Sequence, residues 1–179
     1  GYDHCRHQLA RLPGGVELHN LYVPSGGDVP DRDANPKFAH KLDFLRDLAA
    51  HWRAQGAAAR AMIAVGDLNI APLETDVWSH KQLLNVVSHT PVEVEALGEL
   101  KASAAFTDAV RAVIPPEQKL YSWWSYRARD WSASDRGRRL DHVWVTPPLA
   151  ASVRDARVLR AARGWQKPSD HVPVIVELQ

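Results

Sequence analysis

Ala61-Met62-Ile63-Ala64-Val65-Gly66-Asp67-Leu68-Asn69 is an apolar run that ends abruptly in two polar side chains. Its first six residues are typical of a short buried strand. Asp67 and Asn69 lie two positions apart, so on an extended chain their side chains leave the same face. Polar groups at the carboxyl end of a strand commonly line a ligand crevice. Asp and Asn also favour turns, and Pro72 follows closely, so a functional site and a simple turn both remain open.

A hairpin and a helix are predicted on the N-terminal side of this strand. His4–Leu12 and Val16–Val23 flank Pro13-Gly14-Gly15, a pattern that predicts two strands joined by a tight turn. Apolar residues recur at helical spacing through Lys37–Gln55, and Gly56 lies where such a helix would end.

The C-terminal side mixes helices and strands without strict alternation. Helices are expected at Glu93–Ala102, Thr107–Val113 and Pro147–Val153. Strands are expected at Leu120–Tyr126, Leu140–Val145, Ala156–Leu159 and Val172–Leu178. This order favours an α/β or α+β domain with mixed sheets, two of which pack face to face.

The composition narrows the class of protein. The chain has 179 residues, of which 45% are hydrophobic and 24% charged, which suits one domain over 1–179. Because the net charge is only +1, any binding to nucleic acid must come from local clusters of basic residues. The single cysteine excludes an internal disulfide framework and fits a reducing compartment. With no apolar run of membrane length and no export leader in the sequence, a cytoplasmic protein is expected.

A second polar cluster, Lys167-Pro168-Ser169-Asp170-His171, precedes the last predicted strand. Neighbouring residues of an extended chain point to opposite sides, so Asp170 and His171 are not expected to pair with each other. A catalytic His171 would need a carboxylate from another strand. Asp141 is the candidate, because it lies among residues that should otherwise be apolar. Alternatively, Asp170 caps a turn and His171 is an ordinary surface residue.

The segment Tyr121-Ser122-Trp123-Trp124-Ser125-Tyr126-Arg127 is rich in aromatic residues. On a strand, Tyr121 and Trp123 would share one face, and Trp124 and Tyr126 the other. One face is expected in the core, and the other can stack on a sugar or a base. Five arginines, which suit phosphate contacts or simply a solvated loop, lie here: Arg127, Arg129, Arg136, Arg138 and Arg139.

The remaining histidines give weaker signals. His4-Cys5-Arg6-His7 does not have the spacing of a structural zinc site. His80 and His89 follow the central motif in a segment without clear periodicity, and both are expected to be surface residues.

Several of these stretches, taken in order, resemble the motifs of the exonuclease III family. Asn20-Leu21-Tyr22-Val23-Pro24-Ser25-Gly26 looks like its NxYxPxG motif, and Gly66–Pro72 looks like GDxNxxP. The later blocks follow in the expected order: Trp78–Lys81, Tyr121–Arg127, Arg136–Asp141 and Lys167–Pro173. The resemblance implies a four-layer α/β sandwich with two packed mixed β-sheets. It also implies cleavage of duplex DNA at abasic sites and from 3′ ends, with Mg²⁺ or Mn²⁺ as cofactor.

The same resemblance implies roles for individual residues. Asp67 would activate water, Tyr22 and Asn69 would contact the scissile phosphate, and Asp170 would bind the metal. His171, oriented by Asp141, would also address the phosphate. The abasic pocket and its surroundings would be lined by Trp123, Arg127, Arg138 and Leu140, although Arg138 stands where some members of the family have an aromatic residue.

Part of the family pattern has no counterpart in the chain. The missing N-terminal part would carry the first strands, an Asn, and a Glu that binds the metal. We therefore expect the chain to be completed by that segment or by a second chain. Two alternatives stay open: a non-catalytic remnant that binds DNA, and a phosphoesterase of the same fold that acts on a lipid headgroup or a nucleotide.

Overall fold

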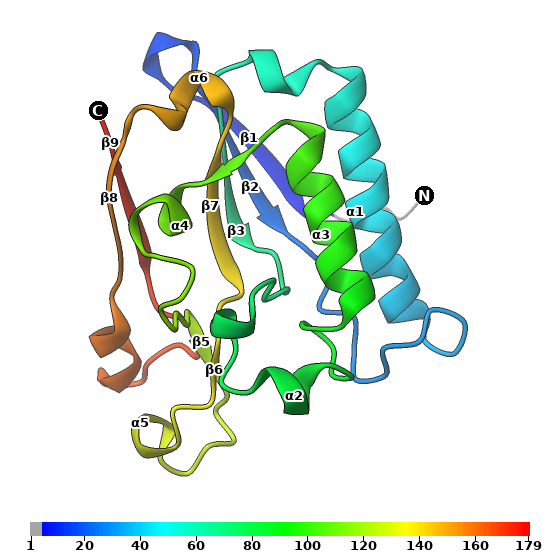
Figure 1. Cartoon of the computed structure of the whole chain (residues 1–179), viewed down its shortest axis with the longest axis vertical. Helices are drawn as coiled ribbons and strands as arrows, with labels where there is room; N and C mark the ends of the chain where they lie inside the picture. The colour runs from blue at the N-terminus through cyan, green and yellow to red at the C-terminus, as the bar shows by residue number, and fades with distance from the viewer. Residues whose placement is uncertain (1–4) are drawn as a thin grey trace.

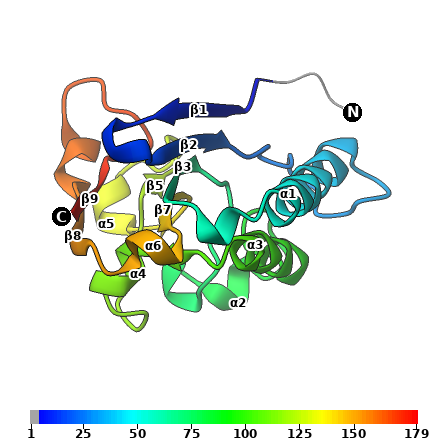
Figure 2. The same cartoon turned by 90° about the horizontal axis from the view of Figure 1, so that it is seen from above.

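The computed structural model describes residues 5–179. Two helices cover one face of a central sheet, and a small two-stranded sheet packs against part of the other face (Figure 1). Seen from above, the central sheet separates these two coverings (Figure 2). Within the described residues, the two helices, the central sheet and the small sheet form three of the four layers that the family resemblance implies. The mixed α/β class is confirmed.

The central sheet has five strands in the order β1-β2-β3-β7-β4. β1 (His7–Arg11) and β2 (Glu17–Tyr22) form the predicted antiparallel hairpin, and β2 runs parallel to β3 (Met62–Asp67). β7 (Asp141–Val145) is antiparallel to β3, and the short strand β4 (Thr107–Asp108) pairs with the other side of β7. The stretch that ends in Asp67 is therefore the middle strand.

Gly66 allows β2 and β3 to approach each other where the motif begins. Its φ is 130°, and a Cβ atom there would lie 2.0 Å from the carbonyl oxygen of Leu21. A residue with a side chain cannot occupy this position without moving the backbone. Gly66 thus fixes the spacing of the two strands immediately before Asp67.

Helices α1 (Pro36–Ala54) and α3 (Pro91–Ser103) pack side by side on the sheet. The side chain of Asn35 caps α1. The chain leaves the helix through Gly56 in the left-handed conformation, at the position where the sequence predicts that the helix ends. The core beneath the helices includes Leu45, Trp52, Met62, Phe106 and Trp144. No helix among residues 5–179 combines the length and the apolar character needed to cross a membrane.

The opposite face of the sheet carries β8 (Val153–Val158) and β9 (Val174–Leu178), which pair antiparallel. Val174 and Val176 of β9 pack in one cluster with Val143 of β7. Two short strands, β5 (Trp123–Trp124) and β6 (Gly137–Arg138), form a separate pair near the start of β7. The remaining helices are short: α2 (His80–Leu83), α4 (Ala109–Val113), α5 (Trp131–Ser134) and α6 (Pro147–Ala150).

Several predicted elements differ from the structure. The strand predicted over Ala156–Leu159 is β8, which begins earlier, at Val153. Thr107 and Asp108 are extended and not helical, because they pair with β7 as an edge strand before Asp108 caps α4. The predicted helix over Pro147–Val153 stops at Ala150, and Val153 already belongs to β8. The strand predicted over Leu120–Tyr126 is limited to two residues.

The aromatic faces predicted for that segment are also wrong. Tyr121 and Trp124 are buried together in one cluster, whereas Trp123 is half-buried and Tyr126 is exposed. Because the segment is not a regular strand, alternation does not determine which side chains enter the core. Trp123 is thereby free to face the cavity described below.

Candidate active site

Three polar side chains from separate elements meet at one edge of the central sheet. Asp67 ends β3, Asp141 begins β7 directly opposite it, and His171 precedes β9. Each offers a ligand atom that lies within 4.8 Å of the other two. The sequence predicted this convergence for residues that are far apart in the chain.

His171 is oriented by Asp141, the carboxylate from another strand that the sequence analysis named as its candidate partner. Its Nδ1 lies 2.8 Å from Asp141 Oδ2, and its Nε2 lies 3.9 Å from Asp67 Oδ2. Ser122 donates its hydroxyl to Asp141 Oδ2 at 2.6 Å and accepts the backbone N–H groups of Leu140 and Asp141. Sequence reasoning missed Ser122, although its place beside the aromatic residues was the available signal.

Asn69 forms a turn with Asp67, and its side chain also contacts the Asp67 carboxylate. Its backbone N–H donates to Asp67 Oδ1 at 2.9 Å, which makes a turn, and its φ is 53°. Its side-chain Nδ2 donates to Asp67 Oδ2 at 3.0 Å and to the carbonyl oxygen of Val23 at 2.9 Å. The turn therefore holds the Asp67 carboxylate from two sides.

The electrostatics of the cluster favour a bound cation. Burial, and then the charge of Asp141, raise the pKa of Asp67 to about 6, although His171 opposes the shift. Burial alone would lower the pKa of His171, but the hydrogen bond and charge of Asp141, with the charges of Asp67 and Asp170, raise it. Half-buried carboxylates that repel each other suit a divalent metal ion, which prefers oxygen ligands. The donor set is thus one that could hold a divalent metal ion.

Asp170 and Tyr22 lie at the margins of the cluster. Asp170 accepts a hydrogen bond from the Nε1 of Trp123 at 3.0 Å, and its charge acts on His171. Tyr22 stands opposite Asp67 in the parallel register of β2 and β3 and is 55% exposed. The guanidinium of Arg6 lies 5.2 Å from the centre of its ring. Both side chains are therefore available at the predicted edge.

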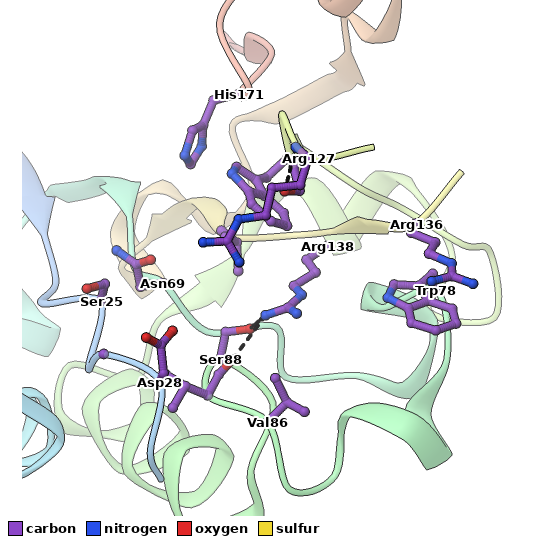
Figure 3. A pocket seen from close by; sticks show the side chains of 15 residues that line it. Ser25, Asp28, Asn69, Trp78, Val86, Ser88, Arg127, Arg136, Arg138 and His171 are labelled. Carbon is purple, nitrogen blue, oxygen red and sulfur yellow. Dashed lines mark hydrogen bonds between the residues drawn. The ribbon is translucent and has the colours of Figure 1, made fainter. Parts of the chain in front are cut away.

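A cavity of about 580 Å³ adjoins the cluster. Asn69 and His171 lie on one side of it, and Ser88 and Arg138 face it from another (Figure 3). All four residues predicted to line a substrate pocket do line this cavity: Trp123, Arg127, Arg138 and Leu140.

Arg138 places a cation in the wall of this cavity. Its Nη1 donates to the Ser88 hydroxyl at 2.7 Å and to the carbonyl oxygen of Val87 at 3.0 Å, and its guanidinium lies 5.4 Å from the ring centre of Trp123. Arg136 lies 4.6 Å from the ring centre of Trp78 on the same cavity. Guanidinium groups beside aromatic rings can take up phosphates and stacked groups together.

Arg139, the neighbour of Arg138, has a different role from the phosphate contact that its sequence context suggested. It is buried, and it donates two hydrogen bonds to Asp76, at 2.8 and 2.9 Å, and one to Asp108 at 2.7 Å. The expected surface position of His89 is also wrong. His89 is 3% exposed. Its Nδ1 lies 2.6 Å from the carbonyl oxygen of Ala71, and its Nε2 lies 2.8 Å from Nδ1 of His80. Arg139 and His89 therefore both stabilise the segment that follows Asn69.

The N-terminal histidine pattern falls partly outside the described residues, because His4 is not among them. Cys5 is exposed, and His7 pairs with His19 on the neighbouring strand at 2.8 Å. This partner lies outside the local pattern and was missed.

Two curated proteins match much of this chain in sequence. Exodeoxyribonuclease III of Haemophilus influenzae is 28% identical over 172 residues, and the match covers 93% of this chain but 62% of that protein. An exodeoxyribonuclease of Bacillus subtilis is 37% identical over 117 residues, which are 64% of this chain and 43% of the relative. The chain thus spans less than two thirds of the length of these relatives.

Solved structures of similar proteins also match nearly all of this chain and about two thirds of their own length. An AP endonuclease from Archaeoglobus fulgidus superposes with a TM-score of 0.88 at 28% identity, covering 97% of this chain and 65% of that one. The 3′ phosphatase NExo from Neisseria, bound to a product DNA hairpin, gives a TM-score of 0.87 at 30% identity with the same coverage. The sequence profile of the Endonuclease/Exonuclease/phosphatase family matches residues 1–171. The chain therefore belongs to the Endonuclease/Exonuclease/phosphatase family, and its resemblance to exonuclease III is confirmed.

Proposed function

We propose that the protein hydrolyses phosphodiester bonds of duplex DNA, at abasic sites and from 3′ ends. The observation that carries this proposal is the Asp67–Asp141–His171 cluster beside a cavity lined by three arginines and two tryptophans. The names of the relatives support DNA as the substrate. Arginines and aromatic rings next to the carboxylates suit a polymer that offers phosphates and an exposed sugar.

In this proposal, Asp67 orients the water that attacks the phosphorus atom. Its raised pKa keeps it near the range in which a carboxylate can accept a proton. Asp67 takes one proton from this water, and the new bond from the water oxygen to phosphorus forms as the bond to the 3′ oxygen breaks. The 3′ oxygen leaves as a hydroxyl with a proton drawn from solvent. His171, held by Asp141, presents Nε2 to the phosphate and stabilises its developing negative charge. The Tyr22 hydroxyl supplies a further hydrogen-bond donor. Asn69 would donate to the phosphate by releasing one of its two Nδ2 hydrogen bonds, to Asp67 or to Val23.

A divalent metal ion, when bound, would neutralise charge on the phosphoryl oxygens. Asp170 is the proposed ligand on this chain, and its charge acts on His171, which lies in the cluster with Asp67 and Asp141. The family resemblance places a further ligand, a Glu, and an Asn in a part of the pattern that the chain does not match. We therefore propose that a segment outside the domain at 1–179, or a second chain, completes the site.

The cavity gives Arg127, Arg138, Trp123 and Leu140 their proposed role in holding the displaced sugar and its flanking phosphates. An abasic nucleotide is easier to extrude than a paired one, because no base has to unstack. The protein would then act on chromosomal DNA in the cytoplasm.

The test is incision of a duplex that contains one abasic analogue, compared with a duplex without it. We expect cleavage with Mg²⁺ or Mn²⁺ and none with EDTA. Equal cleavage in EDTA would overturn the proposal of a metal-dependent enzyme. A panel with a phosphoinositide headgroup and a nucleotide tests the alternative substrates. Salt-sensitive DNA binding without cleavage, even with the completing segment present, would favour the non-catalytic alternative.

A further inference from the structure

An ion pair that is not part of the catalytic cluster is buried between α1 and α3. Lys41 of α1 donates to Glu93 in the first turn of α3, and both side chains are 0% exposed. A buried ion pair is weak as a source of stability, because desolvation of two charges offsets most of their attraction. The other hydrogen bonds of Lys41 and Glu93 therefore say more about the role of the pair than its charges do.

The Lys41 ammonium joins two loops. Besides Glu93, it donates to the carbonyl oxygen of Asn69 at 2.8 Å and to that of Ser25 at 3.2 Å. An ammonium has three N–H groups, and each has an acceptor here. Ser25 follows β2 and Asn69 follows β3, so Lys41 fixes the ends of two neighbouring strands to each other.

Glu93 holds a third loop. Its carboxylate accepts the backbone N–H of Ser88 at 2.9 Å and the hydroxyl of Thr90 at 2.7 Å. Ser88 has a φ of 90°, a conformation that is costly for a residue with a side chain and that needs support from its surroundings. The Ser88 hydroxyl in turn accepts from Arg138 in the cavity wall.

The three loop residues held in this way all line the 580 Å³ cavity: Ser25, Asn69 and Ser88. We infer that Lys41 and Glu93 are a positioning pair for the proposed reaction, which sets the backbone of these three residues. The inference rests on the proposed function for its catalytic consequence. Asn69 links the pair to the chemistry, because its N–H and side chain both hold the Asp67 carboxylate while Lys41 holds its carbonyl oxygen. The charge of Lys41 also acts on Asp67 directly.

A purely structural role makes a different prediction. The double substitution Lys41→Met with Glu93→Gln removes both charges together, fills the same space, and keeps an acceptor for the Ser88 N–H. It leaves no unpaired buried charge, so the protein is expected to fold. The carbonyl oxygens of Asn69 and Ser25 nevertheless lose their donor. If the pair only supported the fold, this well-packed double variant would keep the loop residues of the cavity in their original positions.

The matched control is an exposed ion pair that joins the same two helices. Arg53 Nη2 of α1 lies 2.7 Å from Glu99 Oε2 of α3, and these side chains are 50% and 67% exposed. Arg53→Met with Glu99→Gln removes a link between α1 and α3 without touching any residue of the cavity.

The experiment measures amide hydrogen exchange at Asn69 and Ser88 in the full chain, together with kcat and KM on the abasic duplex. For the Lys41/Glu93 double variant we expect both amides to exchange at least about tenfold faster, while Ala64 in β3 is unchanged. We also expect kcat to fall about tenfold with little change in KM. The Arg53/Glu99 control should change none of these quantities.

A folded double variant whose Asn69 and Ser88 amides exchange at the original rate overturns the inference. If the double variant does not fold, the unaltered protein decides: its Asn69 amide should exchange as slowly as Ala64, and fast exchange at Asn69 contradicts the inference. Because exchange does not require catalysis, absence of DNA cleavage by the unaltered protein would overturn the proposed function alone.

Discussion

The Nδ1 atom of His171 lies 2.8 Å from Oδ2 of Asp141, which precedes it by 30 residues in the chain. The contact leaves Nε2 directed toward Asp67 at 3.9 Å. A carboxylate on one ring nitrogen fixes the orientation of the imidazole and favours its protonated form. The pair is therefore an oriented donor toward the space beside Asp67.

Replacing Asp141 by Asn should separate this orienting role from the fold. The substitution keeps the shape of the side chain but removes the charge that acts on His171. We expect the rate of incision to fall by about 10²–10³-fold, the usual contribution of one donor to developing negative charge. The measurement is the initial rate on the abasic duplex. Asp155→Asn, an exposed carboxylate on β8, is the control, and an equal loss in that variant would contradict the assignment.

Arg127 should contribute to DNA binding through phosphate contact. It is exposed and lines the cavity next to Trp123. Arg127→Ala is expected to weaken binding of all duplex sequences alike and to reduce the slope of log K against log salt by about 1. Fluorescence anisotropy over a range of salt measures both effects. Arg46→Ala on α1, which is 62% exposed and outside the cavity, should leave the slope unchanged.

The stability of the fold should decrease in mild acid because of His7 and His19. Their nitrogens lie 2.8 Å apart, so at least one ring must be neutral. Burial and the neighbouring histidines lower the pKa of His7, and burial lowers the pKa of His19 although Glu17 opposes it. The unfolded chain binds these protons near pH 6.5, so it gains protons first as the pH falls.

The contribution of this pair is therefore complete above about pH 6.5 and is lost progressively below it. Urea unfolding at pH 8 and at pH 5.5 measures the difference in free energy of unfolding. His7→Asn should make that difference smaller, because the unfolded state no longer gains the proton. The same decrease in the variant and in the unaltered protein would show that the pair does not contribute.

Two glycines should respond in opposite ways to the same added methyl group. At Gly66, a Cβ would lie 2.0 Å from Leu21 O, and φ is 130°, so Gly66→Ala is expected to cost more than about 2 kcal/mol of stability. At Gly98, inside α3, a Cβ meets nothing within 4 Å. Gly98→Ala should add about 0.5–1 kcal/mol through helix propensity. Urea denaturation tests both, and a neutral Gly66→Ala would contradict the close approach of β2 and β3.

Local patterns predicted the regular parts of the fold. Turn residues between two alternating stretches predicted the β1–β2 hairpin, and the period of apolar residues predicted α1 nearly to its ends. The opposite directions of neighbouring side chains excluded Asp170 as the partner of His171, and the apolar neighbours of Asp141 indicated that residue in its place. These predictions succeed because each depends on backbone geometry over a few residues.

Predictions that depended on distant partners were less complete. The short strand β4 exists only because β7 is beside it, and His89 is buried only because Ala71 and His80 fold over it. Lys41 had a sequence signal that was not used: it falls on the apolar face of its helix, three residues after Phe38. A charge at such a position indicates a buried partner, but Glu93 is 52 residues away.

The alignment of Tyr22, Asp67 and Asp141 across three neighbouring strands has a consequence for how the protein can evolve. Side chains in a strand alternate between two faces, so one residue inserted into β3 before Asp67 would send its carboxylate toward the helices. The loops around the cavity can change length without this penalty. Insertions and deletions should therefore be tolerated at the rim, where they alter which substrates enter, and be eliminated from the strands that carry the reactive groups.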